Sequence, residues 1–231
     1  MAIVTGGSRG LGRAVASELL GKGLRVIIDA RDRGELERTR AELSQAGEVV
    51  AIAGDAGDPN HVHDLIDAAQ RFGRLDLLVN NASNLGATPL PAIERLDRRT
   101  FDLLFTVNVF APIHLMQHAL KLMARSQQGT IVNVTSDAGV EAYPGWGGYG
   151  ATKAALEHVS RVLAAELEGR STRVLVFDPG DMNTAMHRDA VPDADPAQLR
   201  DPADSARALL RAIAEMNGGY ARVSASDLIW A

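Results

Sequence analysis

Three side chains able to exchange protons stand close together in the second half of the sequence. Tyr149 and Lys153 are four residues apart, and Ser136 precedes Tyr149 by thirteen positions. Residues at i and i+4 of a helix share one face, so a helix here would place the ammonium group beside the phenol. Free tyrosine titrates near ~10, and a neighbouring positive charge lowers that pKa. The pattern predicts a proton-transfer site with Tyr149 as general acid and base.

A glycine-rich loop near the start of the chain predicts a second site. Residues 5–12 read TGGSRGLG and directly follow the apolar residues 2–4. Gly6 permits a tight turn, while Gly10 and Gly12 let the backbone approach a phosphate and let a helix pack on a sheet. The N–H groups and dipole at the start of the following helix attract the pyrophosphate. The loop therefore predicts a dinucleotide site.

Short apolar runs alternate with amphipathic stretches along the whole chain. The expected strands are 2–4, 25–30, 48–53, 75–80, 130–135 and 173–178, with a further strand within 220–229. The expected helices are 13–20, 35–45, 60–72, 98–125, 150–167 and, as the last one, 204–216. This alternation predicts an α/β fold: a doubly wound, mostly parallel sheet of six or seven strands with helices on both faces, a Rossmann fold. No linker divides residues 1–231, so one domain is expected.

The unusual residues follow the ends of the expected strands. The glycine loop follows the first strand, Asn80-Asn81-Ala82 the fourth, Ser136 the fifth and Pro179-Gly180 the sixth. The carboxyl ends of parallel strands lie at one edge of a sheet, where such folds bind their ligands. These residues are therefore expected to share one edge. The asparagines could instead serve only to terminate their strand.

Together these motifs resemble the short-chain dehydrogenase/reductase family. T-G-x-x-x-G-x-G, N-N-A, a serine thirteen residues before Y-x-x-x-K, and P-G occur in the family's order over nearly the whole chain. The resemblance implies that Ser136 binds the substrate oxygen and that Lys153 also holds the nicotinamide ribose. It implies that Asn108 anchors a water that relays protons to Lys153. The implied catalytic set is Asn108, Ser136, Tyr149 and Lys153.

The resemblance also implies a set of coenzyme contacts. Asp55 would bind the adenine, or would only form a turn within 54–57, and Thr184 would contact the nicotinamide carboxamide. The implied set is Gly6, Ser8, Arg9, Gly10, Leu11, Gly12, Arg31, Asp55, Asn81, Ala82, Tyr149, Lys153, Pro179, Gly180 and Thr184.

The end of the second strand bears on the choice of coenzyme. A carboxylate there would bind the adenosine ribose of NAD, but the position is occupied by Ala30. Arg31 beside it, and Arg9 in the glycine loop, could pair with the 2′-phosphate of NADP. NADP(H) is therefore favoured over NAD(H). Asp29 would reverse this preference if the strand were displaced by one residue.

A segment rich in proline and aspartate, about 181–202, follows the sixth strand. It reads as a mobile lid over the substrate, or as a surface loop without such a role.

His114 and His118 have a spacing that can bind zinc on a helix. Because no H-E-x-x-H pattern is present, we expect them to lie on a helix surface or at an interface, without a metal. His61 and His63 open a helix and are expected to face solvent.

Composition excludes several classes of function. The net charge is −5, which provides no basic face for nucleic acid, and no apolar run is expected to reach membrane-spanning length. Cysteine is absent, and the first strand leaves no room for a signal peptide. Both facts fit a cytoplasmic protein.

The combined motifs predict an NADP(H)-dependent carbonyl reductase or alcohol dehydrogenase. An alternative is a non-catalytic Rossmann-fold dinucleotide sensor, although such proteins usually lose the tyrosine or lysine. Epimerase or dehydratase work on nucleotide sugars would need a larger C-terminal domain. The resemblance further implies a homodimer or homotetramer formed through helices 98–125 and 150–167, acting on a small molecule.

Overall fold

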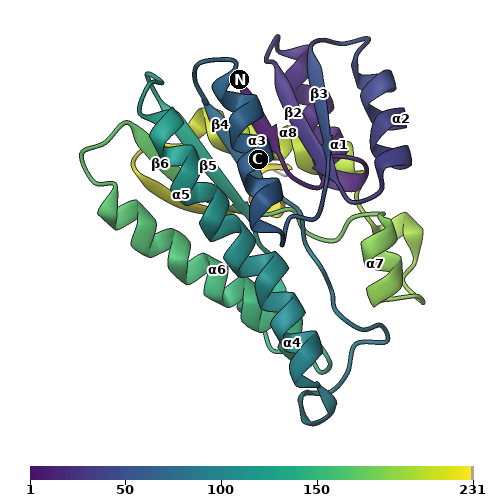
Figure 1. Cartoon of the computed structure of the whole chain (residues 1–231). Coiled ribbons are helices and arrows are strands. Elements are labelled where there is room, and N and C mark those ends of the chain that lie inside the picture. Colours follow the sequence, from purple (N-terminus) through teal and green to yellow (C-terminus); the bar gives the residue numbers. More distant parts are fainter. Residues whose placement is uncertain (230–231) are drawn as a thin grey trace.

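A single parallel sheet organises the protein, as the computed structural model of residues 1–229 shows (Figure 1). Within these residues the strands are β1 Ala2–Val4, β2 Val26–Ala30, β3 Val49–Ala53, β4 Leu77–Asn80, β5 Gly129–Val134, β6 Thr172–Asp178 and β7 Tyr220–Ser224. Their order is β3-β2-β1-β4-β5-β6-β7, and every adjacent pair is parallel. The predicted doubly wound fold is confirmed, with seven strands.

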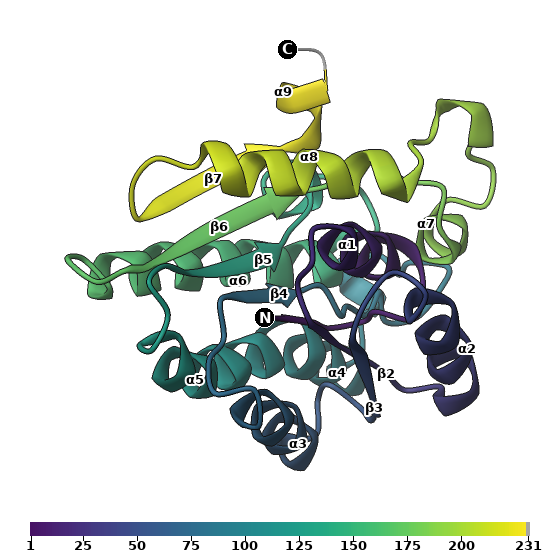
Figure 2. The ribbon, with the colours of Figure 1, turned by 90° about the horizontal axis from the view of Figure 1, so that it is seen from above.

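Helices cover both faces of the sheet (Figure 2). They are α1 Gly10–Gly21, α2 Arg33–Leu43, α3 Pro59–Gln70, α4 Arg98–Phe105, α5 Ala111–Met123, α6 Gly147–Glu166, α7 Ala185–Ala190, α8 Pro202–Glu215 and α9 Ala225–Ile229. Successive strand side chains point to opposite faces, so Val4 packs into the cluster under α1, α2 and α8, while Ile3 packs under α3 and α5. Burial on both faces explains why the strands are apolar without alternation.

The expected helix over 98–125 is interrupted by a π-helical turn, Thr106–Phe110, between α4 and α5. Asn108 lies inside this turn. Pro112, in the first turn of α5, has no N–H group, so the carbonyl oxygen of Asn108 four residues earlier lacks its α-helical donor. Turns of this kind are frequent at functional sites. The interruption therefore removes the α-helical donor of a backbone acceptor near the expected catalytic residues.

The segment Arg98–Met123 is also long and apolar enough, by length and composition, to cross a membrane. The expectation that no apolar run reaches that length was therefore wrong. Half of its most apolar window is buried inside the fold, with Leu115 and Met116 in the cluster beneath α3 and α5. A core helix passes the same test, so this one helix is weak evidence for membrane insertion.

The C-terminal part differs from the sequence-based expectation. The seventh strand ends at Ser224, and 225–229 form α9, so α8 is not the last helix. Ser224 starts α9 because its Oγ accepts from the Ser226 N–H at 3.3 Å, while the Asp227 carboxylate accepts from the Ser224 N–H at 3.2 Å. This reciprocal pair is a capping arrangement that stops the strand and begins a helix. The terminal Trp230 and Ala231 lie outside the described residues.

Candidate active site

A cleft of about 1140 Å³ lies at the carboxyl edge of the sheet. It opens where the strand order reverses between β1 and β4, the position at which doubly wound sheets bind ligands. Ten members of the expected coenzyme set line it: Gly6, Ser8, Arg9, Gly10, Leu11, Arg31, Asp55, Asn81, Ala82 and Thr184. The other five, Gly12, Tyr149, Lys153, Pro179 and Gly180, do not form its wall.

The glycine loop has little space for side chains. Gly6 and Gly10 adopt positive φ angles of 66° and 54°, which glycine adopts without strain. A Cβ atom on Gly12 would overlap the carbonyl oxygen of Gly6 and the Nδ2 atom of Asn81. Asn81 Nδ2 in turn donates to the Thr5 carbonyl oxygen at 2.8 Å. Asn81 thus braces the loop as well as lining the cleft.

A buried ion pair supports the loop from below. Asp29 Oδ1 accepts from the Gly6 N–H at 2.7 Å, and its Oδ2 lies 2.8 Å from His61 Nε2. Both side chains are at most 3% exposed, so the expectation that His61 faces solvent was wrong. Gly54 makes room for the imidazole, since a Cβ there would overlap the ring. Burial alone would lower the pKa of His61, but the hydrogen bond and charge of Asp29 raise it.

The same contacts fix the side chain of Asp29 at the wall of the cleft. Asp29 pairs with Ile52 of β3, points beneath the loop and has both carboxylate oxygens engaged. Arg9 and Arg31 are exposed and line the cleft, and neither forms an ion pair within residues 1–229. Asp55 both stabilises the turn and lines the cleft: its Oδ1 accepts from the Gly57 N–H at 2.9 Å, and the residue is part of the cleft wall.

Tyr149 and Lys153 lie together on α6, at 8% and 2% exposure. The Lys153 Nζ atom is 5.3 Å from the centre of the Tyr149 ring and donates to the Val134 carbonyl oxygen at 2.9 Å. Burial raises the pKa of Tyr149 above its usual value, against a smaller lowering by Ser83. Burial also lowers the pKa of Lys153 to about 8. The expected lowering of the phenol pKa is not found in the protein alone, because burial of Tyr149 outweighs the opposing effects.

Ser136 begins a short 3₁₀ turn, 137–139, at the end of β5 and is half-buried. Its hydroxyl donates to Asp137 Oδ1 at 2.9 Å and accepts from the Ala138 N–H at 3.2 Å. Trp146 packs edge-on against the Tyr149 ring, with 5.7 Å between ring centres. The Ser136 hydroxyl is thus oriented by its own turn.

The side chain of Asn108 is 1% exposed and makes four hydrogen bonds. Its Oδ1 accepts from the Asn84 N–H and the Ser83 hydroxyl, and its Nδ2 donates to the Asn84 carbonyl and to Thr152 Oγ1. These bonds use the full capacity of an amide. The side chain of Asn108 therefore has no capacity left to bind a relaying water.

Ser83 is a site residue that the sequence reasoning missed. It lines the cleft, donates to Asn108 Oδ1 at 3.2 Å and interacts with the phenol of Tyr149. It therefore links the cleft wall to the buried tyrosine. Its position directly after Asn80-Asn81-Ala82 was the available signal.

The segment 181–202 lies against the cleft and the tyrosine. Its ends are joined, because the Asn183 N–H donates to the Arg200 carbonyl at 2.9 Å and the Arg200 N–H donates to the Asp181 carbonyl at 3.0 Å. Thr184 caps α7, and Ala190 at the end of α7 packs on the apolar cluster of Leu85, Ala138 and Tyr149.

The proline and glycine before this segment have structural contacts. Pro179 accepts from the Ser205 hydroxyl at 2.9 Å, and Gly180, with φ 68°, lies beside the Arg200 guanidinium. They set the direction in which the chain leaves β6.

Comparison with known proteins gives consistent matches. A family model described as short chain dehydrogenase matches residues 1–195. The rhamnolipids biosynthesis 3-oxoacyl-(acyl-carrier-protein) reductase of Pseudomonas aeruginosa is 36% identical over 194 residues, which cover 81% of this chain and 75% of that protein. A short chain dehydrogenase structure from Salmonella enterica serovar Typhi has a TM-score of 0.89 at 29% identity, covering 97% of this chain and 94% of that one. A Shigella flexneri structure complexed with NADP has a TM-score of 0.88 at 27% identity, covering 97% and 96%.

Proposed function

The chain belongs to the short-chain dehydrogenase family, and we propose that it transfers hydride between NADP(H) and a carbonyl or secondary alcohol. The observation that carries this proposal is the connection between the cleft and a buried acid–base group. Ser83 lines the cleft and bonds Asn108, which is bonded through Thr152 to the helix that holds Tyr149 and Lys153. Cleft and proton donor are thus connected by one hydrogen-bonded network.

The residues at the cleft fit a dinucleotide. The loop leaves no space for a Cβ at Gly12, and it leads into the N-terminus of α1, whose first N–H groups and dipole attract phosphate. Arg9 and Arg31 add positive charge on the same wall. When bound, the coenzyme supplies or accepts the hydride at the substrate carbon.

In our proposal, Tyr149 handles the proton. During reduction its O–H donates to the carbonyl oxygen as that oxygen gains charge, and during oxidation the phenolate takes the proton back. The raised pKa of Tyr149 keeps the proton on the phenol before reaction. Ser136 would hold the substrate oxygen, and Lys153, with a pKa lowered to about 8, would exchange protons with a water at the Asn108 carbonyl.

We propose NADP(H) rather than NAD(H) as the preferred coenzyme. An NAD site needs a free carboxylate for the ribose hydroxyls, and Asp29, the nearest candidate, is 1% exposed and engaged by Gly6 and His61. The small side chain of Ala30 would leave space for a 2′-phosphate, and the guanidinium of Arg31 would pair with its charge. The Shigella flexneri structure complexed with NADP supports this choice.

The segment 181–202 is proposed to act as a lid over the substrate. Ala190 packs on the apolar cluster around Tyr149, so movement of this segment would change how a substrate carbonyl reaches the phenol. The apolar neighbours Leu85, Leu90 and Trp146 favour a carbonyl compound with an apolar body. Coenzyme binding is expected to protect the segment from proteolysis.

A second copy of the chain is the proposed protein partner. Leu103 on α4, Phe110 in the π turn and Val162 on α6 are 44%, 59% and 44% exposed. Large apolar side chains exposed on neighbouring helices are typical of contact surfaces. A homodimer or homotetramer would cover them.

The test measures the oxidation of NADPH and of NADH by the protein in the presence of ketones, sugars, steroids and acyl thioesters. Turnover of at least one carbonyl class, faster with NADPH, is the expected result. Tight NADPH binding with no turnover on any class would contradict the proposal and favour a dinucleotide sensor.

A further inference from the structure

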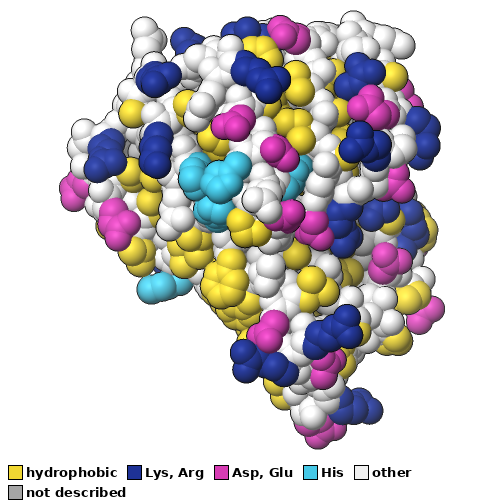
Figure 3. Space-filling model, viewed as in Figure 1, with side chains coloured by type: hydrophobic (Ala, Val, Ile, Leu, Met, Phe, Trp, Pro, Cys, Tyr) yellow, Lys and Arg dark blue, Asp and Glu magenta, His cyan; other side chains and the backbone are white. Residues whose placement is uncertain are grey.

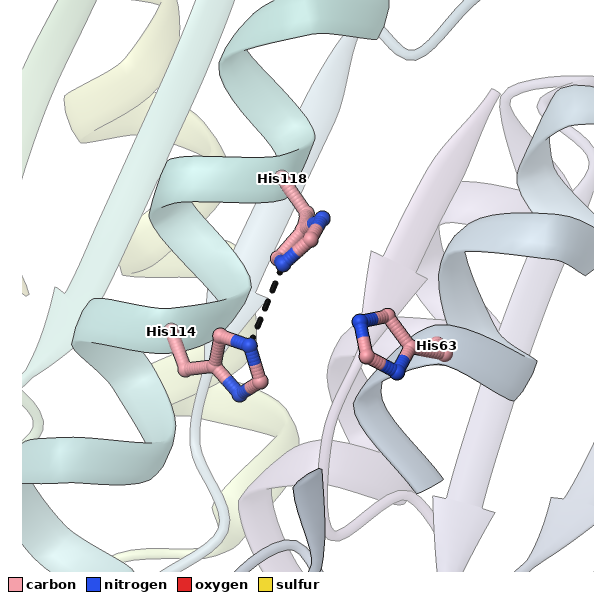
Figure 4. A group of neighbouring side chains, drawn as sticks. All are labelled: His63, His114 and His118. Atoms are coloured by element: carbon pink, nitrogen blue, oxygen red, sulfur yellow. Dashed lines mark hydrogen bonds between the residues drawn. The ribbon is translucent and has the colours of Figure 1, made fainter. Parts of the chain in front are cut away.

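We propose that His63, His114 and His118 form a zinc-binding site on the outer face of the protein, with water as a fourth ligand. The rings come from α3 and α5 and point toward one another (Figure 4). One ligand nitrogen from each ring lies within 4.8 Å of those of the other two. Figure 3 shows the histidines gathered on the surface over these helices, open to solvent.

The distances suit tetrahedral coordination. Two imidazole nitrogens bound to zinc at ~2.0–2.1 Å are about 3.4 Å apart in a tetrahedral arrangement. The Nε2 atoms of His114 and His118 are 3.1 Å apart, and turning either ring slightly supplies the difference. His63 is exposed, and its ring centre is 4.9 Å from that of His118 and 5.5 Å from that of His114. It needs only a side-chain rotation to complete the set.

The ligand chemistry selects the metal. Among residues 1–229 the cluster contains imidazole nitrogens alone, without a carboxylate or thiolate. Calcium and magnesium prefer oxygen ligands, whereas imidazole suits zinc, copper, nickel and cobalt. Three histidines with one open position are a common zinc arrangement. Zinc is therefore the cation to which we commit.

A hydrogen bond between neighbouring helix residues is the competing explanation for part of the cluster. It accounts for the contact between His114 and His118, which are one turn apart on α5. It does not account for a third ring from another helix that approaches both, at near-perpendicular angles of 83° and 89°. The expectation of no metal at this pair rested on α5 alone, because His63 lies 51 positions before His114.

Zinc would join two elements that carry parts of the coenzyme cleft. His63 lies one half-turn beyond His61, whose ring bonds Asp29 under the glycine loop. Helix α5 continues from the π turn that contains Asn108. The metal would thus connect α3 to α5 without touching substrate, and its effect is on stability. A ligand that binds only the folded state raises the unfolding temperature.

The experiment is calorimetric titration of the tag-free full-length chain with Zn²⁺. One zinc per chain is expected, and His63→Ala, His114→Ala and His118→Ala should each weaken binding at least tenfold. His158→Ala is the matched control, since His158 is exposed on α6 outside the cluster, and it should bind as the wild type does. Circular dichroism without metal identifies any variant that fails to fold, and His→Gln at the same position then replaces it.

Two further readouts separate a three-ligand site from weaker binding. Zinc should raise the Tm of the wild type and His158→Ala but not that of His63→Ala. Cobalt should give the strong visible bands of a four-coordinate ion. Absence of zinc binding, equal binding by His63→Ala and wild type, or weak octahedral cobalt bands would each overturn the proposal.

Discussion

Replacing the buried carboxylate of Asp29 by an amide tests how the glycine loop is held. Asparagine keeps the size and one acceptor but removes the charge facing the Gly6 N–H at 2.7 Å and His61 Nε2 at 2.8 Å. Hydrogen bonds to charged groups contribute ~1.5–3 kcal/mol and neutral ones ~0.5–1.5 kcal/mol. Two weakened bonds therefore lower the free energy of unfolding by about 2 kcal/mol. For a chain of this size the Tm falls by about 4–8 °C.

This loss depends on pH through His61. Burial would lower the pKa of His61, but the hydrogen bond and charge of Asp29 raise it in the folded protein. Below the unfolded-state pKa of ~6.5 the imidazole is protonated in both states, and the ion pair contributes its full stability. That contribution is lost as the pH rises through the folded-state pKa. The difference in unfolding free energy between wild type and Asp29→Asn is therefore larger at pH 6 than at pH 9.

Urea unfolding followed by circular dichroism at both pH values measures this difference. Asp32→Asn is the matched control, because Asp32 is exposed and caps α2 by accepting from the Glu35 N–H, a role that asparagine fills equally well. If Asp29→Asn proves as stable as Asp32→Asn at pH 6, the buried ion pair does not support the loop and the reasoning is refuted.

Three further predictions concern coenzyme and assembly. Arg31→Asp should lower the ratio of kcat/KM for NADPH to kcat/KM for NADH about tenfold or more, because a charge-assisted bond worth ~1.5–3 kcal/mol is lost. Steady-state kinetics measure this ratio, and an unchanged ratio would count against the assigned phosphate contact. Gly12→Ala should lower the free energy of unfolding by about 1–3 kcal/mol and abolish coenzyme binding. Gly21→Ala should do neither, because a Cβ atom there would have no neighbouring atom within 4 Å. Urea unfolding measures the stability and calorimetry the coenzyme binding of both variants. Phe110→Asp should shift light scattering to the monomer mass, whereas Ile93→Asp, also exposed, should not; an unchanged mass for Phe110→Asp would place the interface elsewhere.

Local pattern was sufficient for the architecture. The apolar runs predicted the strands, and the rule that carboxyl ends of parallel strands share one edge predicted that Gly6 and Asn81 lie together, as they do on the cleft wall. Thr184 was expected there only from the family resemblance. The structure departs from the expected elements at the chain end, where the capping pair of Ser224 and Asp227 turns an apparent strand into a helix. It also departs in the π turn inside the expected helix 98–125 and in α7 inside the expected loop 181–202.

Pairings between distant segments could not be read from the sequence. His61 bonds Asp29 across 32 positions, and His63 meets His118 from a different helix, so no local spacing marks either contact. Burial is equally non-local. Burial shifts the pKa values of both the Tyr149 phenol and the Lys153 ammonium, and around Tyr149 the buried neighbours are Leu85, Ala138 and the end of α7. The i, i+4 spacing predicted their proximity but not this environment.

The most direct test of the central claim compares Tyr149→Phe with wild type in turnover and in coenzyme binding. A positioned general acid contributes roughly 10²–10⁴-fold, so kcat should fall by that factor while the Kd for NADPH stays within about twofold. Tyr220→Phe, on β7, controls for loss of a buried tyrosine hydroxyl elsewhere and should keep its activity. A Tyr149→Phe enzyme that turns over at the wild-type rate would contradict the account.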